Sequence, residues 1–233
     1  MAKQKGTKSP HRGRVWAWRI FLTLGLLIGL ALVFNEPIKL WVVDLLGNRA
    51  SQHLDADTIK QNEKVKGSFD FDAVNALDLT TVGKAAGANL KPIGMIAVPS
   101  VKMKLPIFKG LANSNLSAGA GTMKPDQKMG EGNYALAGHY MTNKGILFSP
   151  LKGVTRGDNV YITDLTKVYT YKVTSKAVIY ESHVEVIDDV PGKKLITLIT
   201  CASATEGETN RIFIRGALTS AKPITAQTEK LFK

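Results

Sequence analysis

The chain has 233 residues and a formal net charge of +12, a length that suits one ordinary domain with appendages. Six of its 31 basic residues precede residue 20, so the remainder holds 25 basic and 19 acidic groups, a net charge of +6. That excess suits an anionic membrane or envelope. No aromatic-plus-basic motif accompanies it, so we expect no nucleic-acid partner. A single cysteine also excludes an internal disulfide.

The N-terminal residues predict a membrane anchor. A basic flank at 1–19 has no acidic residue and is followed by an uncharged apolar run from Ile20 to Phe34. With the residues just before it, the run is long enough for a hydrocarbon core of roughly 30 Å. A cleaved signal peptide is the alternative, but no pair of small residues marks a cleavage position. We therefore expect a transmembrane segment at 20–36, with a cytoplasmic N-terminus and an extracellular remainder.

Residues 37–91 have a mixed character. Apolar residues recur at helical spacing after residue 37, and polar residues dominate further along. From residue 66 onward, small and polar types alternate without sustained periodicity, with room for one short helix. We interpret 37–91 as an extracellular helical stem and linker.

From residue 92 the pattern changes to short strands. Runs rich in β-branched and aromatic residues alternate with turn residues, and 112–133 reads as a long connection rich in Gly and Asn. Frequent strands without long helices between them are typical of an all-β barrel or sandwich. We place this domain at 92–222, followed by a C-terminal tail at 223–233.

Cys201 stands where a nucleophile would be held firmly and still be reachable. It follows the β-branched run 195–200 and precedes a polar loop. Because strand residues alternate, Thr197 and Ile199 share its face, whereas Thr200 faces the other way. A buried cysteine acting as a small hydrophobic residue is the alternative that composition leaves open.

A catalytic thiol needs a partner that accepts its proton, and His139 is the best-placed histidine. It follows a predicted strand in which Ala137 shares its face and leaves open space beside it. Arg211 opens the last strong strand and is suited to donate to a developing oxyanion. Taken singly, a loop histidine and a surface arginine are the more ordinary interpretations. The remaining histidines lie in the flank, the stem and a loop: His11, His53 and His183.

Three segments together resemble the sortase family: YALAGHY at 134–140, TLITC at 197–201 and RIFIRG at 211–216. The stretches LPIFKG and LFSPL resemble its class A, or housekeeping, branch. The likeness covers residues 92–220. It implies an eight-stranded sortase-type β-barrel in a membrane-anchored cysteine transpeptidase of a Gram-positive bacterium.

The resemblance assigns a role to each candidate residue. It makes Cys201 the nucleophile, His139 the acid and base, and Arg211 the clamp on the oxyanion and substrate. The positions that match the sorting-signal groove of the family are Ala137, Thr197, Ile199 and Thr200. The implied reaction cleaves an LPxTG-type signal between Thr and Gly. It joins the surface protein, through a thioester, to an amine of a lipid-linked peptidoglycan precursor, with no metal or organic cofactor.

Three alternatives to this function remain open at the level of sequence. A non-catalytic, membrane-tethered domain that binds wall components would tolerate loss of Cys201. A sortase acting mainly as a hydrolase would use water in place of the amine. A pilus-assembling sortase would carry an N-terminal lid with an Asp before an aromatic pair, and Asp70-Phe71 is only a weak echo of it. We therefore favour the housekeeping role.

We predict that activity does not depend on calcium. Some class A members bind calcium through several acidic residues in the connection before the histidine strand, but here that connection offers Asp126 and Glu131 beside two lysines. Ca²⁺ usually takes six or more oxygen ligands. Peptide transfer should therefore be equal in excess chelator and in millimolar calcium. A several-fold stimulation by calcium would contradict the prediction.

Overall fold

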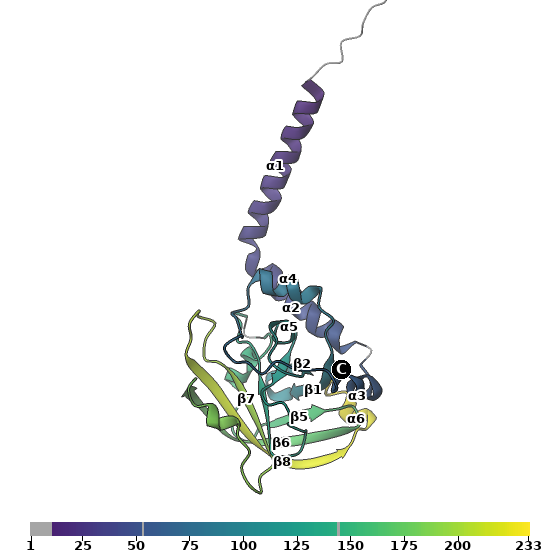
Figure 1. The fold of residues 1–233 in the computed structure, drawn as a ribbon, viewed down its shortest axis with the longest axis vertical. Helices are drawn as coiled ribbons and strands as arrows, with labels where there is room; N and C mark the ends of the chain where they lie inside the picture. The colour runs from purple at the N-terminus through teal and green to yellow at the C-terminus, as the bar shows by residue number, and fades with distance from the viewer. Residues whose placement is uncertain (1–10, 53, 144) are drawn as a thin grey trace, which may run out of the picture. The chain divides into compact units, whose positions relative to one another are not determined.

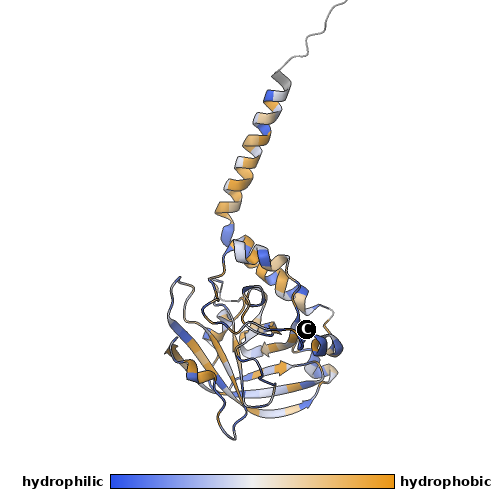
Figure 2. Cartoon of the chain, in the orientation of Figure 1, coloured by the Kyte–Doolittle hydropathy of each residue, from blue (hydrophilic) through white to orange (hydrophobic). Residues whose placement is uncertain are grey.

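The computed structural model describes residues 11–52, 54–143 and 145–233. The chain divides into two compact units, Met1–Lys39 and Leu40–Lys233. In the first unit, α1 (His11–Val33) is a continuous helix that is hydrophobic along most of its length (Figure 2). Among the described residues it is the one helix long and apolar enough to cross a membrane, over Gly13–Val33. It begins before the expected segment at 20–36 and ends slightly earlier.

The second unit is built on a closed barrel of eight strands (Figure 1). These are β1 (Pro92–Val98), β2 (Met103–Phe108), β3 (Ala120–Thr122), β4 (Asn133–Ala137), β5 (Asn159–Thr163), β6 (Lys167–Tyr180), β7 (Leu195–Cys201) and β8 (Asn210–Pro223). Around the barrel their order is β1-β2-β3-β4-β7-β8-β6-β5. The β2–β3 and β4–β7 pairs are parallel and the others antiparallel. The expected eight-stranded barrel is confirmed.

Strand β7 is covered on both of its faces. Its inward side chains, Ile196 and Leu198, are fully buried in the main core inside the barrel. On the opposite face, Ile199 packs in a second cluster with Phe213 and Ile187. A strand buried on both faces reads as a continuous apolar run, which is why LITLIT shows little polar alternation. The scaffold that carries Cys201 is therefore held by packing from two sides.

Strand β3 lies within the stretch that the sequence predicts as a connection. It has three residues, pairs parallel to β2 and antiparallel to β4, and follows the short helix α5 (Asn113–Leu116). A Cβ atom at Gly121 would lie 2.5 Å from the carbonyl oxygen of Gly110, so the close approach of these backbones requires glycine. Glycine needed for close strand packing has the same sequence signal as glycine in a loop.

The residues expected as a stem are packed with the barrel. They form α2 (Asn35–Ser51), α3 (Ala56–Asn62) and α4 (Leu79–Ala86). A shared apolar cluster joins buried side chains of α2 and α4 to the barrel and its loops: Val43, Leu46, Val82, Ala85, Phe108, Ala118, Met141 and Leu147. The second compact unit therefore includes these helices and begins at Leu40.

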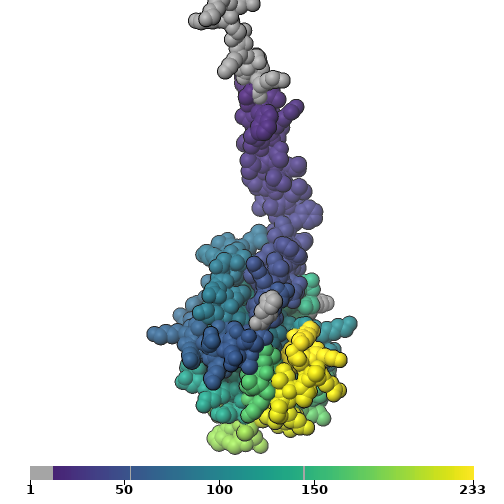
Figure 3. All heavy atoms as spheres, turned by 90° about the vertical axis from the view of Figure 1, so that its right-hand side faces the viewer, coloured from purple at the N-terminus to yellow at the C-terminus, as the bar shows by residue number. Residues whose placement is uncertain are grey.

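The C-terminal residues also pack on the barrel. They form a short helix, α6 (Ala226–Glu229), and then place Phe232, 6% exposed, against Met95, Ala97 and Val168. Figure 3 shows this segment lying on the surface beside the residues around α3. The segment predicted as a tail therefore covers the outside of β1 and β6.

We predict that Leu46→Ala destabilises the second unit by roughly 2–4 kcal/mol, since it removes a buried side chain from a packed cluster. Leu46 is 5% exposed, whereas its neighbour Leu45 is 41% exposed. Leu45→Ala is the matched control and should stay within about 0.5 kcal/mol of the parent. Denaturant unfolding followed by circular dichroism measures both values. Equal stabilities of the two variants would mean that α2 does not pack as described.

Candidate active site

Cys201 is the last residue of β7 and is directly opposite Arg211 of β8. The two residues are partners in the antiparallel β7–β8 register, and both are half-buried. Cβ atoms of directly opposed residues lie roughly 4.5–5.5 Å apart in such a pair. The thiol and the guanidinium therefore leave neighbouring strands at the same level. Beyond Cys201 the chain enters an exposed loop, which leaves this end of β7 accessible.

His139 reaches the same end of the barrel from the other neighbour of β7. Strands β4 and β7 are parallel, with Ala137 opposite Ile199, and the amide of Gly138 donates to the carbonyl of Ile199 at 3.2 Å. Two residues beyond that pair, the chains reach His139 and Cys201. Gly138 itself lies so close to the ring of Phe148 that a Cβ atom would be 2.6 Å from it. Glycine at this position therefore allows the backbone before His139 to pass close to the Phe148 ring.

Burial favours the uncharged forms of His139 and Cys201 at neutral pH. It lowers the pKa of His139 to about 4, because the imidazolium would lose its hydration. Its Nε2 atom is buried and has no hydrogen-bond partner among the described residues. Burial is also the largest influence on Cys201 and raises the pKa of its thiol, while Arg211 acts in the opposite direction. The resting pair is a thiol and a neutral imidazole with a free nitrogen.

Arg211 is held by three oxygen acceptors. Its Nη2 lies 2.5 Å from Oε2 of Glu181, and its Nη1 donates to the backbone carbonyls of Glu208 and Asn210. The Glu208 carboxylate fixes the loop itself by accepting from Ser203 Oγ at 2.6 Å and from the Asn210 amide at 2.9 Å. The guanidinium is therefore fixed between the β7–β8 loop and the end of β6.

The four groove candidates separate into two pairs. Ala137 and Ile199 are partners across β4 and β7, on the same outer face as Cys201, where they belong to one apolar cluster. Thr197 is fully buried and donates to the side-chain oxygen of Asn133 at 2.8 Å. Thr200 is 2% exposed on the opposite face, and its hydroxyl has no partner among the described residues. The structure brings the first two together beside the thiol and keeps the threonines away from solvent.

Hydrogen bonds from two polar side chains, not expected from the sequence, hold the short 3₁₀-helix η3 (Val184–Ile187) against the apolar cluster of Ala137 and Ile199. The Asn133 amide donates to the carbonyls of Val186 at 3.0 Å and Asp188 at 3.1 Å. Arg215 Nη2 donates to the same Val186 carbonyl at 2.6 Å, and its guanidinium carbon lies 5.0 Å from the Phe213 ring centroid. Two polar residues in otherwise apolar strands were the available signals in the sequence: the buried Asn133 before YALAG and the half-buried Arg215 after RIFI.

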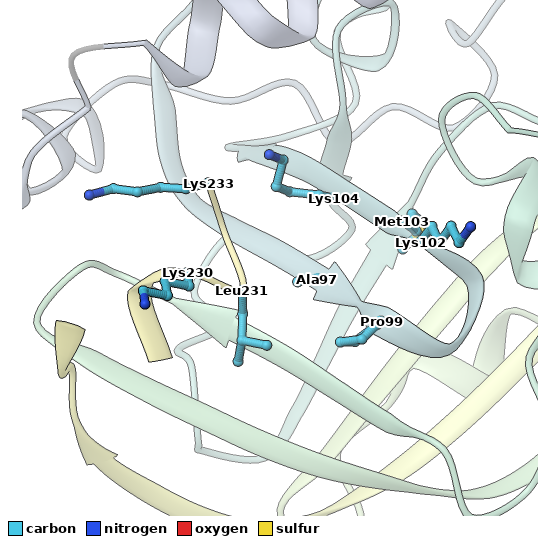
Figure 4. A pocket seen from close by; sticks show the side chains of 8 residues that line it. All are labelled: Ala97, Pro99, Lys102, Met103, Lys104, Lys230, Leu231 and Lys233. Atoms are coloured by element: carbon cyan, nitrogen blue, oxygen red, sulfur yellow. The ribbon is translucent and has the colours of Figure 1, made fainter. Parts of the chain in front are cut away.

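Other expected features lie apart from these residues. His183 is exposed and its Nδ1 lies 2.9 Å from Glu185 Oε1, while His53 falls outside the described residues. In the connection before β4, Lys124 pairs with Asp189 at 2.5 Å. A cavity of 330 Å³ lies between the ends of β1 and β2 and the C-terminal residues (Figure 4), and β1 is opposite β7 in the strand order of the barrel. Its lining is Ala97, Pro99, Lys102, Met103, Lys104, Lys230, Leu231 and Lys233.

The chain is similar to known proteins over most of its length. A sortase-domain profile matches residues 96–219. Sortase A of Streptococcus agalactiae is 40% identical, over 92% of this chain and 89% of its own length. Sortase A of Listeria monocytogenes is 41% identical, over 89% of this chain and 94% of its own. The crystal structure of the Listeria monocytogenes protein superposes with a TM-score of 0.59 at 46% identity, covering 60% of this chain and 97% of that one.

We predict that His139 makes the protein less stable as the pH falls from about 6.5 to about 4. In that window the unfolded chain binds a proton that the folded chain does not, so stability is lost on acidification. This proton uptake should lower the free energy of unfolding by on the order of 1–3 kcal/mol, and His139→Gln should abolish that decrease. Thermal melting between pH 7 and 4.5 measures it. An unchanged slope in the His139 variant would show that the imidazole is hydrated.

Proposed function

The chain belongs to the sortase family of cysteine transpeptidases, and we propose that it cleaves an LPxTG-type sorting signal between Thr and Gly. The acyl group then passes to an amine of a lipid-linked peptidoglycan precursor. The observation that carries the proposal is the placement of Cys201, between His139 and Arg211 on three adjacent strands. In a member of this family, that placement supports the two roles a nucleophilic thiol requires, a proton acceptor and an oxyanion donor.

The first half-reaction forms a thioester. The thiol proton passes to Nε2 of His139, which has no other partner among the described residues, and Sγ attacks the Thr carbonyl carbon. Negative charge develops on the carbonyl oxygen, where the Arg211 guanidinium stabilises it. As the intermediate collapses, the C–N bond breaks and the imidazolium donates its proton to the departing glycine amine. The acyl group remains on Cys201.

The second half-reaction reverses the proton movements. The acceptor amine attacks the thioester carbonyl, His139 takes the proton that the amine loses, and the C–S bond breaks. Sγ leaves as a thiolate and recovers the proton from His139, which restores the neutral pair. Ala137 and Ile199 would lie along the apolar part of the sorting signal, because they share the outer face with the thiol.

The N-terminal helix supports a location at the plasma membrane. In this proposal α1 crosses the bilayer with its basic end in the cytoplasm, and the unit from Leu40 onward is extracellular. Surface proteins and lipid-linked precursors would then be confined to the same two-dimensional surface as the enzyme. Tethering raises the effective concentration of partners without any additional contact.

We predict that the parent protein, given an LPxTG peptide and a panel of amines, yields amide-linked products, detected by mass spectrometry. Cys201→Ala should lower turnover by roughly 10³-fold or more, because it removes the nucleophile. The fold should be kept, because removing one sulfur atom leaves little cavity. Hydrolysis without amine capture would favour the hydrolase. Turnover by the alanine variant would contradict the cysteine mechanism, and an inert parent protein would favour a wall-binding role.

We also predict different outcomes for two arginines on one face of β8. Arg211→Ala and Arg211→Lys should each lose roughly 10²–10³ in kcat/KM, because an ammonium lacks the planar fork of the guanidinium. Arg215 is four residues further along, about 13 Å away at the rise of a strand. Its Nη2 bonds the Val186 carbonyl, which Asn133 also bonds, so Arg215→Ala should stay within a few-fold of the parent. Steady-state kinetics of the three variants decide the assignment. An inactive Arg215 variant beside an active Arg211 variant would reverse it.

A further inference from the structure

Glu181 is a charged residue beside the site that the proposed reaction does not use. It follows the last residue of β6, and its amide donates to the Thr209 carbonyl at 2.9 Å, which ties it to the start of β8. In the β6–β8 register, Ile179 lies opposite Arg211 and Tyr180 opposite Asn210. Three neighbouring strands therefore present a thiol, a guanidinium and a carboxylate at one edge of the barrel.

The contact between Glu181 and Arg211 is short and partly shielded. Nη2 of Arg211 and Oε2 of Glu181 are 2.5 Å apart, with side-chain exposures of 23% and 43%. An ion pair this exposed adds little to folding stability, since water competes for both charges. Its effect on orientation is larger. The two backbone carbonyls bonded to Nη1 set one side of the guanidinium, and the carboxylate sets the other.

We propose that Glu181 is a positioning residue for the transfer reaction, which aims the Arg211 guanidinium at the edge beside Cys201. The proposal rests on the proposed function, because only in that function does Arg211 stabilise the oxyanion. A bidentate fork that is fixed before the substrate arrives does not have to reorganise as charge develops. Without the carboxylate, Arg211 keeps the carbonyl contacts on Nη1 and loses the contact on Nη2.

The carboxylate also influences the thiol, in the opposite direction from the guanidinium. Of the charged groups around Cys201, Arg211 lowers the thiol pKa, whereas the carboxylates of Glu208 and Glu181 raise it. His139, just beyond the end of β4, is neutral near pH 7. Removing the charge of Glu181 should therefore make the thiolate easier to form while it loosens the oxyanion donor. The first effect raises the reactivity of the thiol, and the second lowers the rate of transfer. Loss of a residue that only supports the fold would not change the two rates in opposite directions.

The test compares Glu181→Gln with Glu206→Gln in the full chain. Glutamine keeps the shape of the side chain and removes its charge. Glu206 is exposed in the loop after Cys201 and controls for the loss of one negative charge near the site. Transfer from an LPxTG peptide to an amine is measured as kcat/KM. The thiol is measured separately by its rate of alkylation with iodoacetamide between pH 6 and 10, which requires no sorting signal.

For Glu181→Gln we expect kcat/KM to fall by roughly 10- to 100-fold, as for a misplaced catalytic group. We expect alkylation at pH 8 to become about two-fold faster or more, with its profile moved to lower pH. Glu206→Gln should match the parent in both. Transfer within two-fold of the parent, or alkylation that is unchanged or slower, would overturn the proposal. If the parent protein itself fails to transfer, the proposed function is wrong, and alkylation still reports whether Glu181 acts on the thiol.

Discussion

The pairing of β7 with a parallel strand on one side and an antiparallel strand on the other is the constraint on which the site depends. The parallel partner β4 runs in the same direction as β7, so His139, the second residue after β4, emerges at the end where Cys201 emerges. The antiparallel partner β8 begins at that end, so Arg211 lies there as its second residue. If β4 ran in the opposite direction, the histidine would lie at the far edge of the barrel.

The packing that fixes this geometry also determines the protonation of the groups. Burial disfavours the imidazolium of His139 and the thiolate of Cys201 alike, so neither side chain is charged near neutral pH. The charged residues nearby are Arg211 and its carboxylate neighbours, which lie on the β8 side of the thiol. In the proposed reaction, charge separation would rely on the fixed guanidinium of Arg211, and the orientation of that group would matter accordingly.

Much of the barrel was predictable because its strands are rich in apolar and β-branched residues and are bounded by turn residues. The strand that ends at Cys201 and the strand that contains Arg211 could be placed from this composition and from the turn residues around them. The sequence could not reveal which residues far apart along the chain pack against each other. Val43 and Leu46 occur in an unremarkable helical pattern, and only the surface they meet shows that this helix belongs to the folded unit. Thr200 matches a family position, yet its parity points it into the barrel, and Glu181 becomes relevant only through the register of β6 with β8.

The parallel β4–β7 pair has a consequence for the order in which the molecule acquires its structure. Two parallel strands cannot be joined by a tight turn, and between β4 and β7 the chain makes the whole β5–β6 excursion. His139 and Cys201 are thus roughly 60 residues apart in sequence, and their encounter requires closing a long loop. Contacts of this kind are slow to form compared with hairpins. A partly folded species that lacks the β4–β7 pairing cannot hold the histidine beside the cysteine, so the candidate site assembles only once this pairing has formed.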